Sequence, residues 1–471
     1  MNDAVNDPGA NDPAGTPASD SGPPAPAGPG LRPMIALALP LLVAGLTQIT
    51  VSVVDTVLLA RLSTEGLGAL ALSAPVYLVA LIIARGWAGA VQVRVAHHHG
   101  AGRTADLART VRVGVLGALL AGSVVGGVLY ATAVPILTVL GAPAEVIDPG
   151  TGYLRILAWA VPAAAVTFTL QGACAGIGAT RVTMYNALLV NAVNLPLGLL
   201  LIFRAGLGVT GAALSTLIAT LVGAGYLLLY CRVRLPRDTT GAEDVPAVAR
   251  GLWRIGWPEM STMGIGYLNE ALLTGFAARI GAADLAAYRL VDTLTLIVFT
   301  LLGSAATALT VLAGQELGGD RSDRALERHR TGLRLLLGLV VVSGLVALVF
   351  ARPAYSLVVD DPTVAELAWA TTPLALLSMV PLAWAMSRGS MLRAAGETRW
   401  IMVASVTGDY LLLIPLGWYL GVRLGWGLPG IYVAWTAFAV LYGLLLHLRF
   451  RRRFRRPSPP TREPLPVAPT P

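Results

Sequence analysis

The chain has 471 residues, of which 55% are hydrophobic and 13% are charged. This balance excludes an ordinary soluble domain and indicates an integral membrane protein. The formal net charge is +8. Because most of the arginines lie in short loops and tails, this charge indicates orientation in a membrane rather than binding to nucleic acid.

The two ends of the chain differ from its apolar middle. Residues 1–30 are rich in Pro, Gly, Ala, Ser, Asn and Asp, which predicts a disordered tail, and residues 450–471 form a basic, Pro-rich tail. Between them we expect twelve apolar spans of about 20 residues or more, the length that crosses a bilayer core. Their expected limits are 34–60, 69–96, 111–134, 152–177, 182–203, 207–231, 252–278, 284–313, 332–351, 364–392, 400–421 and 427–449.

Arginine is concentrated in alternate connections between these spans, and the other connections carry few basic residues. Under the positive-inside rule, the arginine-rich connections and both termini are cytoplasmic, in a multi-pass protein of the plasma (inner) membrane. The arginine-rich segments contain Arg103, Arg109 and Arg112; Arg181; Arg232 to Arg254; Arg321 to Arg334; Arg393 and Arg399; and Arg449 to Arg456.

The sequence also repeats itself. One constant difference in residue number, which we call the repeat offset, places Gly318 on Gly100, and after a slip of one residue Pro415 falls on Pro196. Each half has six spans, so the halves share one orientation and are related by an axis along the membrane normal. We expect an all-α membrane fold of two parallel six-helix repeats around a central cleft shaped like an inverted V. The repeats are 31–231 and 251–449, joined by a cytoplasmic linker loop at 232–250.

Ionisable side chains inside the spans are the first candidates for function. Each costs ~2.5–3.5 kcal/mol at bilayer depth, so each is expected to line a cavity or find a partner. Gln48 lies two helical turns before the first of them, Asp55, on the same face. The alternative for Asp55 is a place near the helix end, in interfacial water. The six candidates are Asp55, Arg85, Glu270, Asp292, Arg388 and Asp409.

The repeat relates some of these polar positions to one another. Glu270 falls three residues from Asp55 in the repeat frame, so each half places a carboxylate on nearly the same face of its first helix. Asp409 falls on Asn191, which shares a helix face with Asn194. Interhelical hydrogen bonding is an equally good explanation for these asparagines.

The pairing of the other charges stays open. Arg289 and Asp292 are i,i+3 neighbours that can neutralise each other. Arg85 and Arg388 have no acid nearby in the sequence, which leaves Asp55, Glu270 or helix-end carbonyls as their partners.

The sequence predicts no metal centre. Cys174 and Cys231 lie in or at the end of apolar spans without metal-type spacing. His97, His98 and His99 form a run without a neighbouring carboxylate or cysteine, which favours a solvated loop over a metal site.

The order and spacing of short motifs in both halves resemble the multidrug and toxic compound extrusion (MATE) transporters over residues 34–449, and the first helix resembles the DinF-like and other bacterial branches. The segments that carry the resemblance are Ala38-Leu-Pro40, Gln48, Val54-Asp-Thr56, Gly100-Ala-Gly102, Asn191, Pro196, Gly206-Leu-Gly208, Gly211 to Thr216, Gly256-Trp-Pro258, Ala286 to Arg289, Gly314-Gln315 and Gly396-Glu-Thr-Arg399.

The resemblance implies that Asp55 is the proton or cation site of the first half, supported by Asn191 and Thr216. We expect Gln48 and Asn194, which share helix faces with Asp55 and Asn191, to belong to the same coupling site. Many relatives carry an aspartate just before the proline of the fifth helix, but here Leu195 stands there. A sodium ion would therefore lose a hard ligand. The tenth helix also lacks an acid that one branch carries, and Glu270 lies about one turn from the seventh-helix glutamate of that branch.

We therefore expect a monomeric secondary exporter, not an enzyme, that binds a lipophilic, cationic compound among Glu270, Arg85, Asp292, Arg388 and Asp409. We expect a proton gradient, or less favourably a sodium gradient, to drive export by alternating access. Pro40 offers a bend in the first helix, and no cofactor is expected. Membrane lipids are its only other expected partners. The alternatives are a lipid-linked saccharide flippase of related fold, supported by Arg85 and Arg388, and an intramembrane prenyltransferase, for which Asp360-Asp361 is the only adjacent aspartate pair.

Overall fold

The computed structural model describes residues 30–60, 64–236 and 239–454, and it describes no side chains for residues 49–60 and 64–67. Within these ranges all regular structure is helical. The first half of the chain contains α1 (Leu31–Ala60), α2 (Thr64–Gly100), α3 (Thr104–Val139), α4 (Ala144–Gly176), α5 (Thr180–Leu199), the π-helical η1 (Leu200–Arg204) and α6 (Gly208–Arg234).

The second half follows the same plan with a more divided eleventh span. It contains α7 (Val245–Ile280), α8 (Ala282–Gly318), α9 (Ser322–Val358), α10 (Pro362–Ala394), α11 (Thr398–Gly408), η2 (Asp409–Leu413), α12 (Ile414–Gly417), η3 (Trp418–Arg423) and α13 (Leu428–Phe454). Four successive elements, from α11 to η3, therefore occupy the place of one span. The all-helical membrane fold expected from the sequence is confirmed.

Eleven spans in the described part of the chain are long and apolar enough to cross a membrane. The expected span that does not meet this criterion is α7, which carries Arg250, Arg254, Glu259 and Glu270. Many of the helices have 33 to 37 residues. At 1.5 Å of rise per residue they are roughly 50 Å long, which exceeds the ~30 Å hydrocarbon core and extends them into the interfaces.

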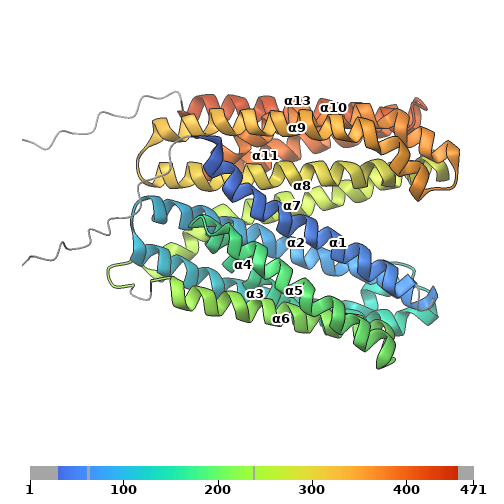
Figure 1. Ribbon diagram of the computed structural model, residues 1–471, viewed down its shortest axis with the longest axis horizontal. Helices are drawn as coiled ribbons and strands as arrows, with labels where there is room; N and C mark the ends of the chain where they lie inside the picture. Colours follow the sequence, from blue (N-terminus) through green and yellow to red (C-terminus); the bar gives the residue numbers. More distant parts are fainter. Residues whose placement is uncertain (1–29, 61–63, 237–238, 455–471) are drawn as a thin grey trace, which may run out of the picture.

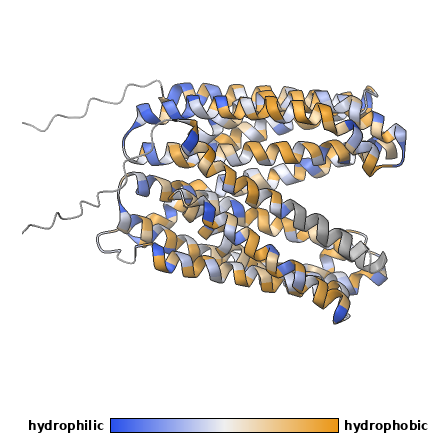
Figure 2. Ribbon diagram, in the orientation of Figure 1, coloured by the Kyte–Doolittle hydropathy of each residue, from blue (hydrophilic) through white to orange (hydrophobic). Residues whose placement is uncertain are grey.

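The two halves form separate bundles that meet at one end (Figure 1). Both described chain ends lie at this end, which we call the terminal side, and the ribbons of the two bundles diverge toward the opposite end. Helix α1 starts beside the second bundle and runs along the first. Hydrophilic residues gather at the helix ends and connections, and hydrophobic residues cover the middle of the bundles (Figure 2).

The outer faces of the bundles are apolar. Leu120, Val124 and Val128 follow one another at helical spacing on α3 and are 61%, 67% and 57% exposed. Such a continuous stripe would be costly in water, whereas lipid chains cover it without penalty. The protein interior is instead filled by small and aliphatic residues from neighbouring helices.

A single extra residue distinguishes the fifth span from the eleventh. The repeat offset places Asp409 on Asn191, but Pro415 falls on Pro196 only when the offset is lengthened by one, so one residue is inserted between Asp409 and Pro415. This interval is η2, a π-helical turn, and the first half has no counterpart to it at Asn191. A π-turn absorbs an extra residue without rotating the helix on either side, and such turns are frequent at functional sites. The position of the insertion therefore supports Asp409 as a candidate functional residue.

The connection between the halves spans residues 235–244, which is shorter than the linker expected at 232–250 because α6 and α7 both extend further. It is fastened to the first bundle. Arg94 of α2 pairs with Glu243 at 2.6 Å, and the Glu243 amide donates to Oδ1 of Asp106 at 2.8 Å.

Candidate functional site

The predicted coupling residue, Asp55, lies on α1, but its side chain is outside the described residues. Pro40 is buried inside the same helix. A proline inside a helix removes one backbone hydrogen bond, which is the usual origin of a helix bend. The exposed Gln48 lies between these two positions.

Polar groups of the first half meet along the seam between α1, α5 and α6. Nδ2 of Asn191 donates to the Thr47 carbonyl oxygen at 3.3 Å, and Nδ2 of Asn194 donates to Oγ1 of Thr216 at 3.3 Å. Asn194 is buried, and its Oδ1 has no hydrogen-bond partner. Asn191 therefore faces α1, Asn194 faces α6, and the Oδ1 acceptor of Asn194 remains available.

In the second half, Glu270 and Asp292 lie on neighbouring helices. Oε1 of Glu270 accepts a hydrogen bond from the Tyr288 hydroxyl at 2.9 Å. Asp292 follows Tyr288 by one turn of α8, which brings the two carboxylates close enough to interact electrostatically. The exposed Arg289 forms no ion pair with Asp292 in the described part of the chain, so the expected mutual neutralisation is not seen.

Asp409 occupies the first position of the π-turn and is 4% exposed. Its Oδ2 accepts from Oγ of Ser405 at 3.2 Å, and the side chain of Asn269 lies within hydrogen-bonding reach. Oδ1 of the buried Asn269 has no donor. A buried carboxyl group next to an unused acceptor is suited to binding a proton, because the protonated acid can donate to an amide oxygen.

Sequence reasoning missed Tyr288 and Asn269. The signals were available, since Asn269 directly precedes Glu270 and Tyr288 lies four residues before Asp292. Neutral residues cost little inside a membrane, however, so burial alone does not mark them as functional. Their importance depends on which carboxylate each one contacts.

The two arginines placed in the substrate cleft lie apart from these acids. The Arg85 guanidinium lies over the Phe168 ring at 4.7 Å, within the first bundle. Arg388 is buried, lies 4.1 Å from the centre of the Trp384 ring, and donates to the Trp384 carbonyl at 3.0 Å and to Nδ1 of His447 at 3.4 Å. The structure pairs Arg388 with neither Glu270 nor a helix-end carbonyl, since Trp384 lies inside α10.

Other buried carboxylates near the terminal side are balanced by arginine. Glu316 is paired with Arg321 at 2.7 Å and with Arg328 at 3.2 Å, and Glu259 is paired with Arg393 at 2.8 Å. Because arginine already neutralises these carboxylates, they are poorly suited to bind a proton or a cationic ligand. Among the acids with described side chains, Glu270, Asp292 and Asp409 differ from them because no arginine forms an ion pair with them.

The histidine run is not a solvated loop, and that expectation is wrong. All three residues belong to the last turn of α2, His98 is 6% exposed, and Nε2 of His97 lies 2.5 Å from the carbonyl oxygen of Ala394. His98 is buried and His97 is half-buried because α2 extends to Gly100 and packs against the second bundle, whereas His99 stays exposed. The buried thiols of Cys174 and Cys231 are free, with their sulfur atoms 3.7 Å apart. No metal-binding group of three or more His, Cys, Asp or Glu residues occurs in the described ranges.

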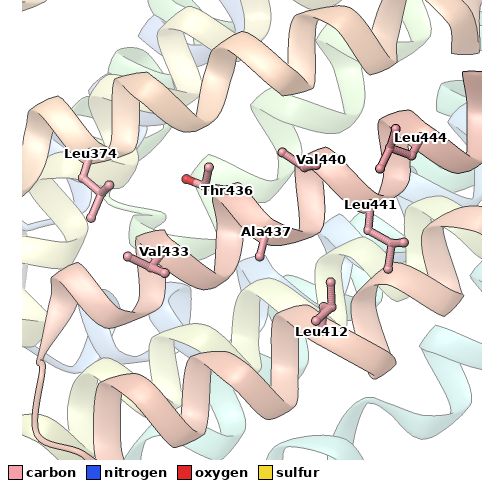
Figure 3. A pocket seen from close by; sticks show the side chains of 8 residues that line it. All are labelled: Leu374, Leu412, Val433, Thr436, Ala437, Val440, Leu441 and Leu444. Carbon is pink, nitrogen blue, oxygen red and sulfur yellow. The ribbon is translucent and has the colours of Figure 1, made fainter.

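A cavity of about 500 Å³ lies between α10, η2 and α13 (Figure 3). Its lining is Leu374, Leu412, Val433, Thr436, Ala437, Val440, Leu441 and Leu444. The Thr436 hydroxyl donates to the Tyr432 carbonyl at 2.9 Å within its own helix. None of the charged candidate residues lines this cavity, so it offers no counter-charge for an ionic ligand.

Comparison with known proteins identifies relatives over most of the chain. The MatE family model matches residues 40–200 and 260–419. A probable multidrug resistance protein NorM of Chromobacterium violaceum is 28% identical over 450 residues, which cover 90% of this chain and 94% of that protein. The multidrug resistance protein MdtK of Yersinia enterocolitica is 24% identical over 446 residues, which cover 91% of this chain and 96% of MdtK.

Solved structures share the fold. A mutant of the Vibrio cholerae MATE transporter VcmN superimposes with a TM-score of 0.84 at 21% identity, covering 90% of this chain and 97% of that chain. A multidrug resistance MATE family transporter in an outward-facing conformation superimposes with a TM-score of 0.82 at 17% identity, covering 91% of this chain and 97% of that chain.

Proposed function

Because this chain belongs to the MatE family of multidrug efflux transporters, we propose that it exports lipophilic, cationic compounds in exchange for protons. The proposal depends mainly on one observation. Glu270 and Asp409 contact neutral groups, and in the described part of the chain no arginine forms an ion pair with them or with the half-buried Asp292. A carboxylate left unbalanced inside a membrane gains stability when it binds a cationic ligand or a proton, so these acids attract a cationic substrate while Asp55 carries the coupling proton.

Protons are favoured over sodium by the oxygen atoms available. Sodium, as a hard cation, requires several oxygen ligands, and a carboxylate is the strongest of these. The described polar groups of α5 and α6 near α1 are the amides of Asn191 and Asn194 and the hydroxyl of Thr216. Asp55 would be the single acid of this site, which is sufficient for a proton and insufficient for a tightly held sodium ion.

The orientation of transport follows from the arginine distribution. The terminal side carries Arg103, Arg109 and the α13 end, with its basic residues Arg451, Arg452 and Arg453. The positive-inside rule makes this side cytoplasmic. Export then requires that a compound enter between the bundles from the terminal side and leave at the side where they diverge.

The two alternatives have less support. A flippase for lipid-linked saccharides requires a cationic path, but Arg388 is buried inside the second bundle against Trp384 and His447. A prenyltransferase needs paired aspartates, and the only adjacent aspartate pair, Asp360-Asp361, belongs to a short connection in which Asp361 caps α10 and accepts from the Thr363 amide at 2.9 Å. Hydrogen bonds from Thr363 lower the pKa of Asp361. Helix capping accounts for that residue, and members of this family are not enzymes.

The proposal is tested with purified protein in proteoliposomes, using a cationic fluorescent dye. We expect dye transport to follow an imposed pH gradient in sodium-free buffer and to stop when the gradient is dissipated. Strict dependence on a sodium gradient would contradict proton coupling and would assign Asn191, Asn194 or Asp409 a role as a sodium ligand.

Asp55→Asn isolates the coupling residue in the same assay. The amide keeps the size of the carboxyl group but cannot bind and release a proton, so we expect inserted protein without gradient-driven transport. Wild-type transport by this variant would exclude Asp55 as the coupling residue.

A further inference from the structure

The ends of α2 and α8 on the terminal side touch through glycine. A Cβ atom on Gly100 would overlap the carbonyl oxygen of Gln315, and one on Gly318 would overlap the carbonyl oxygen of His97. The repeat offset separates the two glycines, so they occupy equivalent places in the two halves. Neither has a positive φ, so the close approach of the two helices, and not backbone conformation, requires the missing side chain.

Two hydrogen bonds flank this contact, and the repeat relates them as well. Nε2 of His97 on α2 meets the carbonyl oxygen of Ala394, the last residue of α10, at 2.5 Å. Nε2 of Gln315 on α8 donates to the carbonyl oxygen of Gly176, the last residue of α4, at 2.8 Å. The repeat offset places Gln315 on His97, and it also places Ala394 on Gly176.

Each bond joins a side chain of one bundle to a helix end of the other. The last carbonyls of a helix have no partner within that helix, so they need an external donor. Here each half supplies the donor that the other half needs. Because the acceptor facing His97 is a carbonyl, Nε2 is the ring nitrogen that carries hydrogen.

The ion pairs of the described residues show a different pattern. Seven join residues of the same bundle, one pair in the first bundle and six in the second. The eighth joins Arg94 of the first bundle to Glu243 in the connection. None joins one bundle directly to the other. The bundles are therefore rigid internally, while their contact at the terminal side depends on neutral hydrogen bonds and close helix packing, which a rigid-body motion can break without separating charges.

We propose that His97 and Gln315, together with Gly100 and Gly318, form the gate that closes the space between the bundles on the terminal side. The inference extends the proposed export function, since it assigns the residues that must separate before a compound enters. Loss of one hydrogen bond lowers the ratio of closed to open protein about fivefold. A methyl group at either glycine has a larger effect, because the closed packing has no space for it.

The gate is tested by a distance that does not depend on any substrate. Spin labels are attached to cysteines that replace Thr104 and Arg324, two exposed residues at the terminal side, one in each half. The native cysteines are buried. Pulsed electron-spin measurements on the full-length protein in lipid nanodiscs then give the populations of short and long distances.

We expect Gln315→Ala and His97→Ala each to raise the long-distance population, and Gly100→Ala and Gly318→Ala to raise it further. Alanine favours the helix at both glycines, so loss of helix stability does not explain the result. Gly127→Ala in α3 and Gly344→Ala in α9 are matched controls, because a Cβ at either position meets no atom within 4 Å. These controls should keep the wild-type distances.

Two results would overturn the gate. One is an unchanged distance distribution in both Gln315→Ala and His97→Ala, variants that retain the helix packing. The other is an equal change in the control glycine variants. Dye transport by the same variants distinguishes failure of the gate from failure of the proposed export function. Shifted distances without drug export support the gate and reject the exporter, whereas export with unshifted distances supports the exporter and rejects the gate.

Discussion

At the residue scale, the chain treats its buried carboxylates in two ways. Glu316 is held between Arg321 and Arg328, whereas Glu270 accepts from the neutral hydroxyl of Tyr288. The first arrangement neutralises the carboxylate with arginine, and the second leaves the carboxylate charge available to a cationic ligand. Substitution of each glutamate by glutamine should therefore have a different consequence, on stability in one case and on transport in the other.

Glu316→Gln should destabilise the protein. Both side chains of the Glu316–Arg328 pair are at most 4% exposed, and loss of one partner from a buried pair typically costs about 3–5 kcal/mol. Glu366→Gln is the matched control, since its pair with Arg352 is more than half exposed and such pairs contribute about 0–1 kcal/mol. Thermal unfolding in detergent measures both. Equal losses would show that Glu316 is not held as a buried pair.

Glu270→Gln should change which compounds are exported while the protein stays folded. A neutral amide loses its attraction for a cationic substrate, so we expect weaker apparent affinity for cations, little change for neutral compounds and an unaltered pH dependence. Tyr288→Phe removes only the hydrogen bond and should shift affinity in the same direction by less. If Glu270→Gln instead abolishes proton coupling while Asp55→Asn retains it, the roles of the two halves are reversed.

At the element scale, the π-turn η2 accounts for the slip between the repeats. The extra residue between Asp409 and Pro415 is held in one widened turn, so the flanking helices keep the register of the first half. The same turn starts at the buried Asp409, which a regular helix would orient differently. The sequence alone revealed the slip, but it did not show whether the extra residue lay in a loop or in a helix.

Deletion of Leu411 tests this explanation. Leu411 is 66% exposed within η2, and its removal should convert the turn to a regular helix without rotating the segments on either side. We expect a monodisperse, folded protein with impaired transport. Deletion of Leu188, a 43% exposed residue of α5, is the control. No π-turn lies on that part of α5, so the rest of the helix must rotate by about 100°. Aggregation of both variants would contradict the role given to η2.

At the scale of the whole molecule, composition and the repeat predicted the membrane fold because lipid restricts a spanning chain to few solutions. The expected spans were shorter than the helices, since apolarity marks the bilayer core and not the turns beyond it. Contacts between distant segments were not predictable. In the sequence, His97 is one residue of a polar run, and only the folded chain shows that its side chain contacts the end of α10. Likewise, the sequence left the partner of Arg388 open, and only the folded chain shows its hydrogen bond to His447.

The central claim is that export and proton movement are coupled. The most direct measurement imposes a gradient of a cationic substrate across proteoliposomes at zero membrane potential, without a pH gradient, and follows the internal pH. We predict proton movement opposite to the substrate in sodium-free buffer, and no proton movement with Asp55→Asn. Substrate movement without any change of internal pH in the wild-type protein would contradict it.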